Sequence, residues 1–207
     1  LVVAGVPLLV LCAGVAMAVQ WLVYLPSAAV QSEKFFDLTG SLTYLSLLAF
    51  SLGMAATQRE ITPRQILVSA AVAVRAVRLG SFLFLRIQRD GKDGRFDHLK
   101  VDPLRFLGVW TIQGLWVFFT AVCVLIINTR ADSGGPLGLI DGIGMALWLA
   151  GFAIEVIADR QKTAFRSRPE SKGRFIDEGL WSRAQHPNYF GEILLWTGLA
   201  VVGAGVF

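Results

Sequence analysis

Six long apolar stretches divide this chain, and they constrain its fold more than any other feature of the sequence. They lie near residues 1–25, 38–57, 64–85, 104–128, 137–157 and 188–207. A helix rises about 1.5 Å per residue, so each stretch is long enough to cross about 30 Å of hydrocarbon. Only 16% of the residues are charged and 55% are hydrophobic, a balance that excludes both disorder and a water-soluble globule. The sequence therefore predicts one all-α domain, 1–207, a polytopic membrane helical bundle with six spans.

The ends of the chain and its few thiols and imidazoles add further expectations. The opening stretch has neither a basic n-region nor a small-residue cleavage pattern, so we expect a true span rather than a signal peptide. The chain lacks an initiating Met and stops inside an apolar stretch at Phe207, so we expect it to be part of a longer protein. Cys12 and Cys123 follow no spacing pattern, and the two histidines lie in different loops. These residues predict neither a disulfide nor a metal site.

Positive charge gathers in two loops of the same parity. Six Lys or Arg residues lie between Arg86 and Arg105, and seven lie between Arg160 and Arg183. The positive-inside rule places both loops in the cytoplasm and the N-terminus outside. Residues 134–136 then form an extracytoplasmic turn, and Gly91 and Gly94 interrupt the first cytoplasmic loop. A net charge of +4 fits this loop asymmetry and gives no reason to expect a nucleic-acid partner.

A polar stripe continues the fifth apolar stretch. Its members recur at intervals of four, three and four residues, so a helix extending beyond the membrane would place them on one face. They are Glu155, Asp159, Lys162 and Arg166. Charges of alternating sign could form only intrahelical ion pairs on a solvated face. Glu155, however, follows apolar residues at membrane depth, where a carboxylate is costly unless it meets a polar cavity or partner. We therefore expect functional roles for Glu155 and Asp159.

The loop that follows the stripe is rich in arginine. Its basic residues surround Pro169 and Gly173, which exclude a regular helix; they are Arg166, Arg168, Lys172 and Arg174. Two readings stay open. Such a loop can pair with anionic lipid headgroups, or its guanidinium groups can grip the phosphate oxygens of a ligand in a bidentate manner.

The last apolar stretch begins with its own polar group. Pro187 fits the first turn of a helix, and the free backbone N–H groups there favour an anion. Asn188 and Glu192 are four residues apart and share a helical face beside Tyr189. Glu192 could instead form a structural hydrogen bond to a neighbouring helix.

Three segments of this region resemble the catalytic part of the steroid 5α-reductase superfamily, in particular its bacterial branch. They are 158–166 (ADRQKTAFR), 172–181 (KGRFIDEGLW) and 186–196 (HPNYFGEILLW), with upstream support from 35–40 (FFDLTG) and 75–97. The resemblance implies a seven-helix reductase in the bacterial inner membrane, whose last helix and tail are missing here. Such a protein would bind NADPH in a cytoplasm-facing cavity and reduce a conjugated enone in a lipophilic, steroid-like or isoprenoid-like substrate. Membrane lipids would be its other partners.

The resemblance also implies a set of cofactor-binding residues. Arg166 and Arg174 would meet the phosphates of NADPH, and the other positions would contact its ribose or nicotinamide groups; these are Glu155, Asp159, His186, Asn188, Tyr189 and Glu192. No Gly-rich fingerprint of a Rossmann pocket is present. The residue that polarises the substrate carbonyl is not identified, and the candidates are Tyr24, Asp37, Tyr44 and Arg75.

Two other classes of protein stay open. Membrane methyltransferases of the isoprenylcysteine or phospholipid type share the His-Pro-x-Tyr-x-Gly entry to a helix, but their S-adenosylmethionine carries no phosphate for the arginines. A lipid-binding relative without activity would keep the same fold.

Overall fold

The computed structural model describes residues 1–130, 135–204 and 206, and among these the fold is helical, as predicted. The long helices are α1 (Leu8–Ala29), α2 (Phe36–Ala56), α3 (Pro63–Asp90), α4 (Pro103–Thr129), α5 (Leu139–Arg166) and α6 (Pro187–Gly203). Short 3-10 turns η1 (Gly94–Phe96), η2 (Pro169–Ser171) and η3 (Gly179–Ser182) lie between them. The chain forms two compact units, of which the first comprises Leu1–Gly135 and the second begins at Pro136.

The helices α1 to α5 are each long and apolar enough to cross a membrane. This finding confirms an integral membrane protein. The described helix α6 has 17 residues, which corresponds to about 25 Å of rise, so the sixth span stays a prediction.

The first span starts later than the sequence predicted. Strands β1 (Val2–Val3) and β2 (Val6–Pro7) pair antiparallel before α1. The turn between them holds Ala4 and Gly5 at positive φ, as a two-residue hairpin turn requires. Pro7 is the N-cap residue of α1 and has an extended ψ of 132°, so the helix begins at Leu8.

Local signals set the ends of α3 and α4. Thr62 and Gln65 form a capping box at the start of α3, and the Asp102 side chain accepts hydrogen bonds from the first backbone N–H groups of α4. Gly91, with φ of 81°, ends α3, and η1 begins at Gly94, so both predicted breaks are confirmed. Of the predicted turn at 134–136, residue 134 lies outside the described residues.

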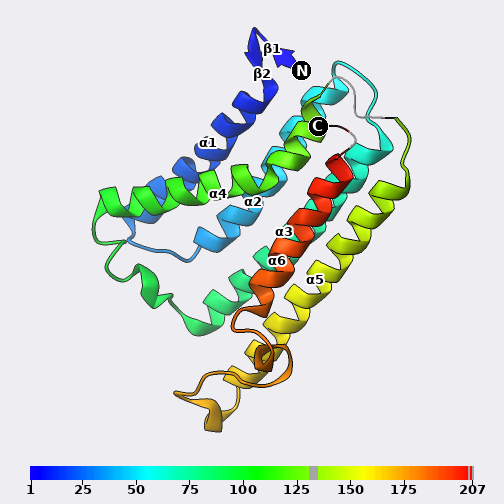
Figure 1. Ribbon diagram of the computed structural model, residues 1–207. Helices are drawn as coiled ribbons and strands as arrows, with labels where there is room; N and C mark the ends of the chain where they lie inside the picture. Colours follow the sequence, from blue (N-terminus) through cyan, green and yellow to red (C-terminus); the bar gives the residue numbers. More distant parts are fainter. Residues whose placement is uncertain (131–134, 205, 207) are drawn as a thin grey trace. The chain divides into compact units, whose positions relative to one another are not determined.

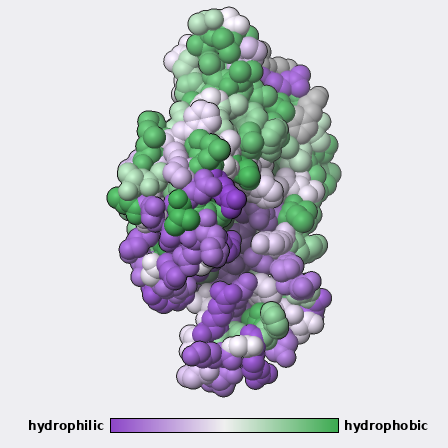
Figure 2. All heavy atoms as spheres, turned by 90° about the vertical axis from the view of Figure 1, so that its left-hand side faces the viewer, coloured by the Kyte–Doolittle hydropathy of each residue, from purple (hydrophilic) through white to green (hydrophobic). Residues whose placement is uncertain are grey.

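Unit 1 contains α1 to α4 (Figure 1). Residues of α1, α2, α4 and the α3–α4 connection form an aromatic cluster in it. The Trp110 ring meets Phe36 edge-on at 5.2 Å, and Phe96 and Phe106 complete the cluster. Figure 2 shows hydrophilic side chains gathered where the α1–α2 and α3–α4 loops lie, and apolar side chains over other parts of this face of unit 1. Exposed apolar residues on α1 and α4 fit contact with lipid; among them are Leu22, Leu25, Ile112 and Phe119.

Unit 2 is an antiparallel pair of helices, α5 and α6 (Figure 1), joined by the loop 167–186. Gly144 faces Gly198 and Gly151 faces Gly191, each pair in direct backbone contact. A Cβ atom at Gly151 would lie 2.5 Å from the Gly191 carbonyl oxygen, so only glycine permits this separation. We call the pair Gly151 and Gly191 the glycine contact.

Candidate functional site

Helix α5 continues past the apolar stretch to Arg166, so the predicted polar stripe does lie on a helix. Its first two carboxylates are buried, Glu155 with 4% and Asp159 with 9% of its surface exposed. Lys162 places its ammonium 4.7 Å from the centre of the Trp181 ring, a cation–π contact. The stripe therefore begins with buried acids and ends at an exposed guanidinium.

Four predicted cofactor-binding residues lie on the same side of the α5–α6 pair. Because a helix advances about 100° per residue, Glu155 and Asp159 lie about 40° and about 80° around α5 from the glycine contact. By the same count, Asn188 and Glu192 lie about 60° and about 100° around α6, in the same sense of rotation. In an antiparallel helix pair, we measure the rotation about each helix as seen from that helix's own N-terminus. Rotation in the same sense about both helices then leads to the same side of the pair. The fold thus gathers two carboxylates from α5 with an amide and a carboxylate from α6.

Asn188 has an unpaired acceptor within this group. Its Oδ1 atom is buried, and no described residue donates a hydrogen bond to it. A buried amide oxygen without a donor is rare and costs free energy. The neighbouring His186 and Tyr189 are exposed and stack on each other, with ring centres 5.2 Å apart.

The loop 167–186 is fastened to α5 by residues that the sequence did not single out. Nε1 of Trp181 donates a hydrogen bond of 3.0 Å to the Ala158 carbonyl oxygen. The Gln161 side chain accepts a bond of 2.9 Å from the backbone N–H of Leu180. Gly179, at φ of 61°, lies so close to Gln161 that a Cβ atom would clash with it. Gly179, two residues before Trp181, was a sequence signal for this anchor.

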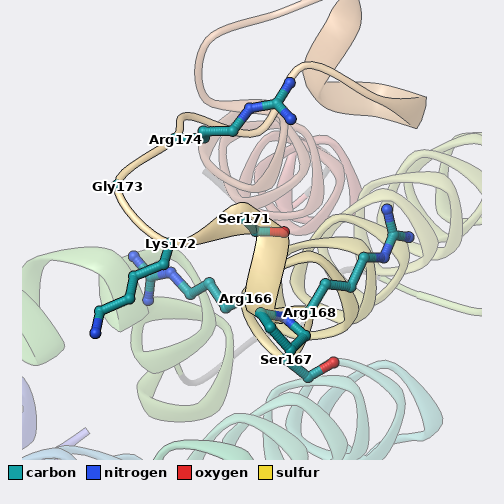
Figure 3. A pocket seen from close by; sticks show the side chains of 8 residues that line it. Arg166, Ser167, Arg168, Ser171, Lys172, Gly173 and Arg174 are labelled. Carbon is teal, nitrogen blue, oxygen red and sulfur yellow. The ribbon is translucent and has the colours of Figure 1, made fainter.

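An open pocket of about 440 Å³ lies where α5 ends. Residues 166–169 and 171–174 line it, including all four basic residues predicted there. In Figure 3 the side chains of Arg166 and Lys172 run to one side, Arg168 runs to the other, and Arg174 reaches away from the loop above them. The pocket is therefore rich in positive charge, but its guanidinium groups do not converge on one point.

The basic residues of this pocket differ in their pairing. Arg168 donates a hydrogen bond of 2.9 Å to Glu178, and this bond raises the pKa of Arg168. Arg166, Lys172 and Arg174 form no side-chain hydrogen bond or ion pair within the described part of the chain. These three cations are available to an anionic ligand.

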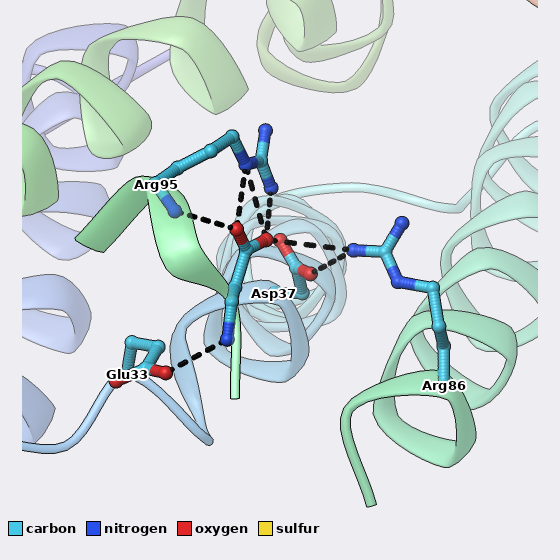
Figure 4. Close-up of polar contacts among 5 residues, drawn as sticks. Glu33, Asp37, Arg86 and Arg95 are labelled. Carbon is cyan, nitrogen blue, oxygen red and sulfur yellow. Dashed lines mark hydrogen bonds and ion pairs between the residues drawn. The ribbon is translucent and has the colours of Figure 1, made fainter. Parts of the chain in front are cut away.

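Unit 1 carries a second polar cluster, at the ends of α2 and α3 (Figure 4). Nη2 of Arg86 lies 3.3 Å from Asp37 and 3.9 Å from Asp93. Arg95 holds Asp93 through both carboxylate oxygens, and these bonds lower the pKa of Asp93. Asp37 is thus one member of an ion-pair network.

The same cluster includes an ion pair between a buried carboxylate and a partly exposed lysine, which the sequence did not predict. Nζ of Lys100 lies 2.8 Å from Oε2 of Glu33, and the backbone N–H of Asp93 donates to the other oxygen at 2.9 Å. Burial raises the pKa of Glu33, but these hydrogen bonds outweigh it and leave the pKa below its ordinary value. The pair ties the α1–α2 loop to the α3–α4 loop.

Two of the other candidates for polarising a carbonyl have hydrogen-bond partners outside this cluster. The Tyr24 hydroxyl donates to the Pro103 carbonyl oxygen at 2.9 Å, and the Tyr44 hydroxyl bonds to Thr120 on α4 at 2.5 Å. Arg75 is buried on α3. Tyr24, Tyr44 and Asp37 thus each have a different polar partner among the described residues.

Comparison with known proteins defines the family. The family model described as protein of unknown function (DUF1295) matches residues 23–207, so the chain belongs to that family. No curated protein and no solved structure matches the chain.

Proposed function

We propose that this protein is a membrane reductase of the steroid 5α-reductase type, which uses NADPH to reduce a carbon–carbon double bond conjugated to a carbonyl in a lipophilic substrate. The observation that carries the proposal is the arrangement of unit 2. Unpaired cations border an open pocket at the end of α5, and one side of the α5–α6 pair bears carboxylates and an amide.

The cations at the pocket match the phosphates of NADPH, and the carboxylates and the amide match its ribose and nicotinamide groups. Guanidinium groups form strong, charge-assisted hydrogen bonds with phosphate, so Arg166 and Arg174 would hold the phosphates. Carboxylates accept hydrogen bonds from ribose hydroxyls or from the nicotinamide amide. Glu155 and Arg166 are eleven residues apart on one helix, a rise of about 16 Å, which suits an extended dinucleotide.

The unpaired oxygen of Asn188 supports the same assignment. An amide N–H of a ligand would satisfy Oδ1, and Glu192, one helical turn further along α6, would take a second donor. When bound, NADPH supplies a hydride to the carbon β to the carbonyl, and a proton is added at the α carbon. The products are then the saturated carbonyl compound and NADP⁺. The residues of this chain bind and orient the nicotinamide end for that transfer.

Charge makes S-adenosylmethionine a poorer fit. That cofactor carries a sulfonium cation and no phosphate, so it would leave Arg166, Lys172 and Arg174 without anionic partners. A methyltransferase would therefore not explain why three cations border the pocket unpaired.

Isotope transfer tests the proposed reaction. The full chain in lipid nanodiscs is incubated with NADPH deuterated at C4 and with two probe substrates, a 4-en-3-one steroid and an isoprenoid enone. We expect one deuterium at the β carbon of a saturated product, with one NADP⁺ formed for each double bond reduced. If neither probe is reduced while a methyl group is transferred from S-adenosylmethionine to an isoprenylcysteine or a phospholipid probe, the reductase proposal is wrong.

A further inference from the structure

The side chain of Phe175 is 95% exposed, more than any other large apolar side chain among the described residues. It follows Arg174, the last residue of the basic pocket. We do not expect the hydrocarbon of the membrane to cover this side chain. Helix α5 continues for nine residues past Ile157, about 13 Å, and this extension carries several charged residues. The loop therefore begins outside the hydrocarbon.

The loop presents Phe175 in a defined way. The ion pair between Arg168 and Glu178, at 2.9 Å, closes the segment 168–178 at its base, as in a compact Ω-loop. Gly173, at φ of 78°, turns the chain near the tip. Phe175 and the unpaired Lys172 and Arg174 lie within four residues of one another in this part of the loop.

An exposed phenyl ring beside unpaired cations favours one kind of ligand. Cations beside the ring attract an anion, and a bare aromatic face gains free energy by stacking on another flat ring. Lipid headgroups offer phosphate but no flat ring. A purine nucleotide offers both, because its base stacks while its phosphates meet the basic side chains.

We propose that Phe175 stacks on the adenine of NADPH and so binds the adenosine half of the cofactor. This inference rests on the proposed function and adds to it a residue that recognises the base. The nicotinamide half, on the side of Asn188 and Glu192, would not depend on Phe175.

Ligand truncation and substitution together test the inference. The full chain in zwitterionic nanodiscs is titrated with NADPH and with reduced nicotinamide mononucleotide, which lacks the adenosine half. The variants are Phe175→Ala, which removes the ring, and Phe175→Trp, which keeps an aromatic face. Phe119→Ala, on the exposed face of α4, is the matched control, since Phe119 is also a largely exposed phenylalanine.

We expect Phe175→Ala to weaken NADPH binding about tenfold or more and to leave binding of the mononucleotide unchanged. Phe175→Trp and the control should bind NADPH as the wild type does. Wild-type affinity in Phe175→Ala, or an equal loss for both ligands, would overturn the role of Phe175 and leave the proposed function standing. Absence of NADPH binding by the wild type would instead remove the proposed function, and this inference with it.

Discussion

Gly151 of α5 and Gly191 of α6 meet backbone to backbone, with 2.5 Å between the Gly191 carbonyl oxygen and the place where a Cβ atom of Gly151 would lie. The close approach bears on the proposed function because it fixes the side of the pair on which Glu155 and Asn188 lie. Close backbone packing of small residues is a common way to hold membrane helices together.

Substitution of Gly151 by Ala should separate the two helices. Since the obstructing atoms belong to backbone, no side chain can move aside, and we expect a loss of about 1–3 kcal/mol in the free energy of unfolding. Unfolding in mixed detergent micelles measures it. Gly142→Ala, on the same helix with open space around its Cβ position, is the control and should be neutral or stabilising. Equal stability of both variants would contradict the packing described here.

The ion pair of Glu33 and Lys100 should make the stability of unit 1 sensitive to acid. Because the pKa of Glu33 is lowered in the folded state, its contribution is present above its ordinary pKa of 4.5 and is lost as the pH falls through the lower folded value. Glu33→Gln should therefore cost roughly 1.5–3 kcal/mol at neutral pH.

Thermal unfolding of the wild type and Glu33→Gln between pH 7 and pH 3 measures this dependence. The two melting temperatures should differ most at neutral pH and approach each other below about pH 4.5. Glu60→Gln, which removes an exposed carboxylate, should track the wild type throughout. A difference that stays constant with pH would show that the Glu33 charge does not stabilise the fold.

The predicted topology can be mapped with single cysteines in a background where Cys12 and Cys123 are replaced by Ala. Cysteines at Lys92 and Lys172 should resist a membrane-impermeant thiol reagent in intact cells and react after permeabilisation. A cysteine at Glu60, in the α2–α3 loop, should react in intact cells. The reverse pattern would place the basic pocket outside, where NADPH is absent.

Arg166 and Arg160 form a matched pair on α5 for testing the phosphate contact. Arg160 is exposed and lies about 180° around the helix from the glycine contact, whereas Arg166 lines the pocket. A charge-assisted contact contributes roughly 1.5–3 kcal/mol, so Arg166→Ala should weaken NADPH binding about tenfold or more. Arg160→Ala should leave the dissociation constant unchanged. Equal effects of the two substitutions would indicate a general loss of charge rather than a contact.

Much of this architecture follows from local sequence signals. Pro187 marks the start of α6, and the apolar stretches located α2 and α4 to within two residues at each end. The stretches placed the start of α1 seven residues too early and the end of α5 nine residues too early. Asn188 and Glu192 share one side of the helix pair with Glu155, and this placement depends on how α5 and α6 pack against each other. That packing comes from glycines seven residues apart on each helix, a pattern that gains meaning only when the two helices are known to be partners.

The pairing of individual charges was less accessible from sequence. Arg168 and Arg166 look equivalent in the sequence, yet Arg168 is paired with Glu178 ten residues later. Glu33 and Lys100 are 67 residues apart, and only the folded loops bring them together. The first residues of the chain form a hairpin rather than the predicted start of a helix. Pro7 interrupts the apolar stretch at that point.

Equilibrium titration of the wild-type chain in nanodiscs, with NADPH and in parallel with S-adenosylmethionine, decides whether the site in unit 2 is a dinucleotide site. We expect saturable binding of NADPH well below millimolar concentration and no binding of S-adenosylmethionine in the same range. No affinity for NADPH up to millimolar concentration, or binding of S-adenosylmethionine alone, would contradict it.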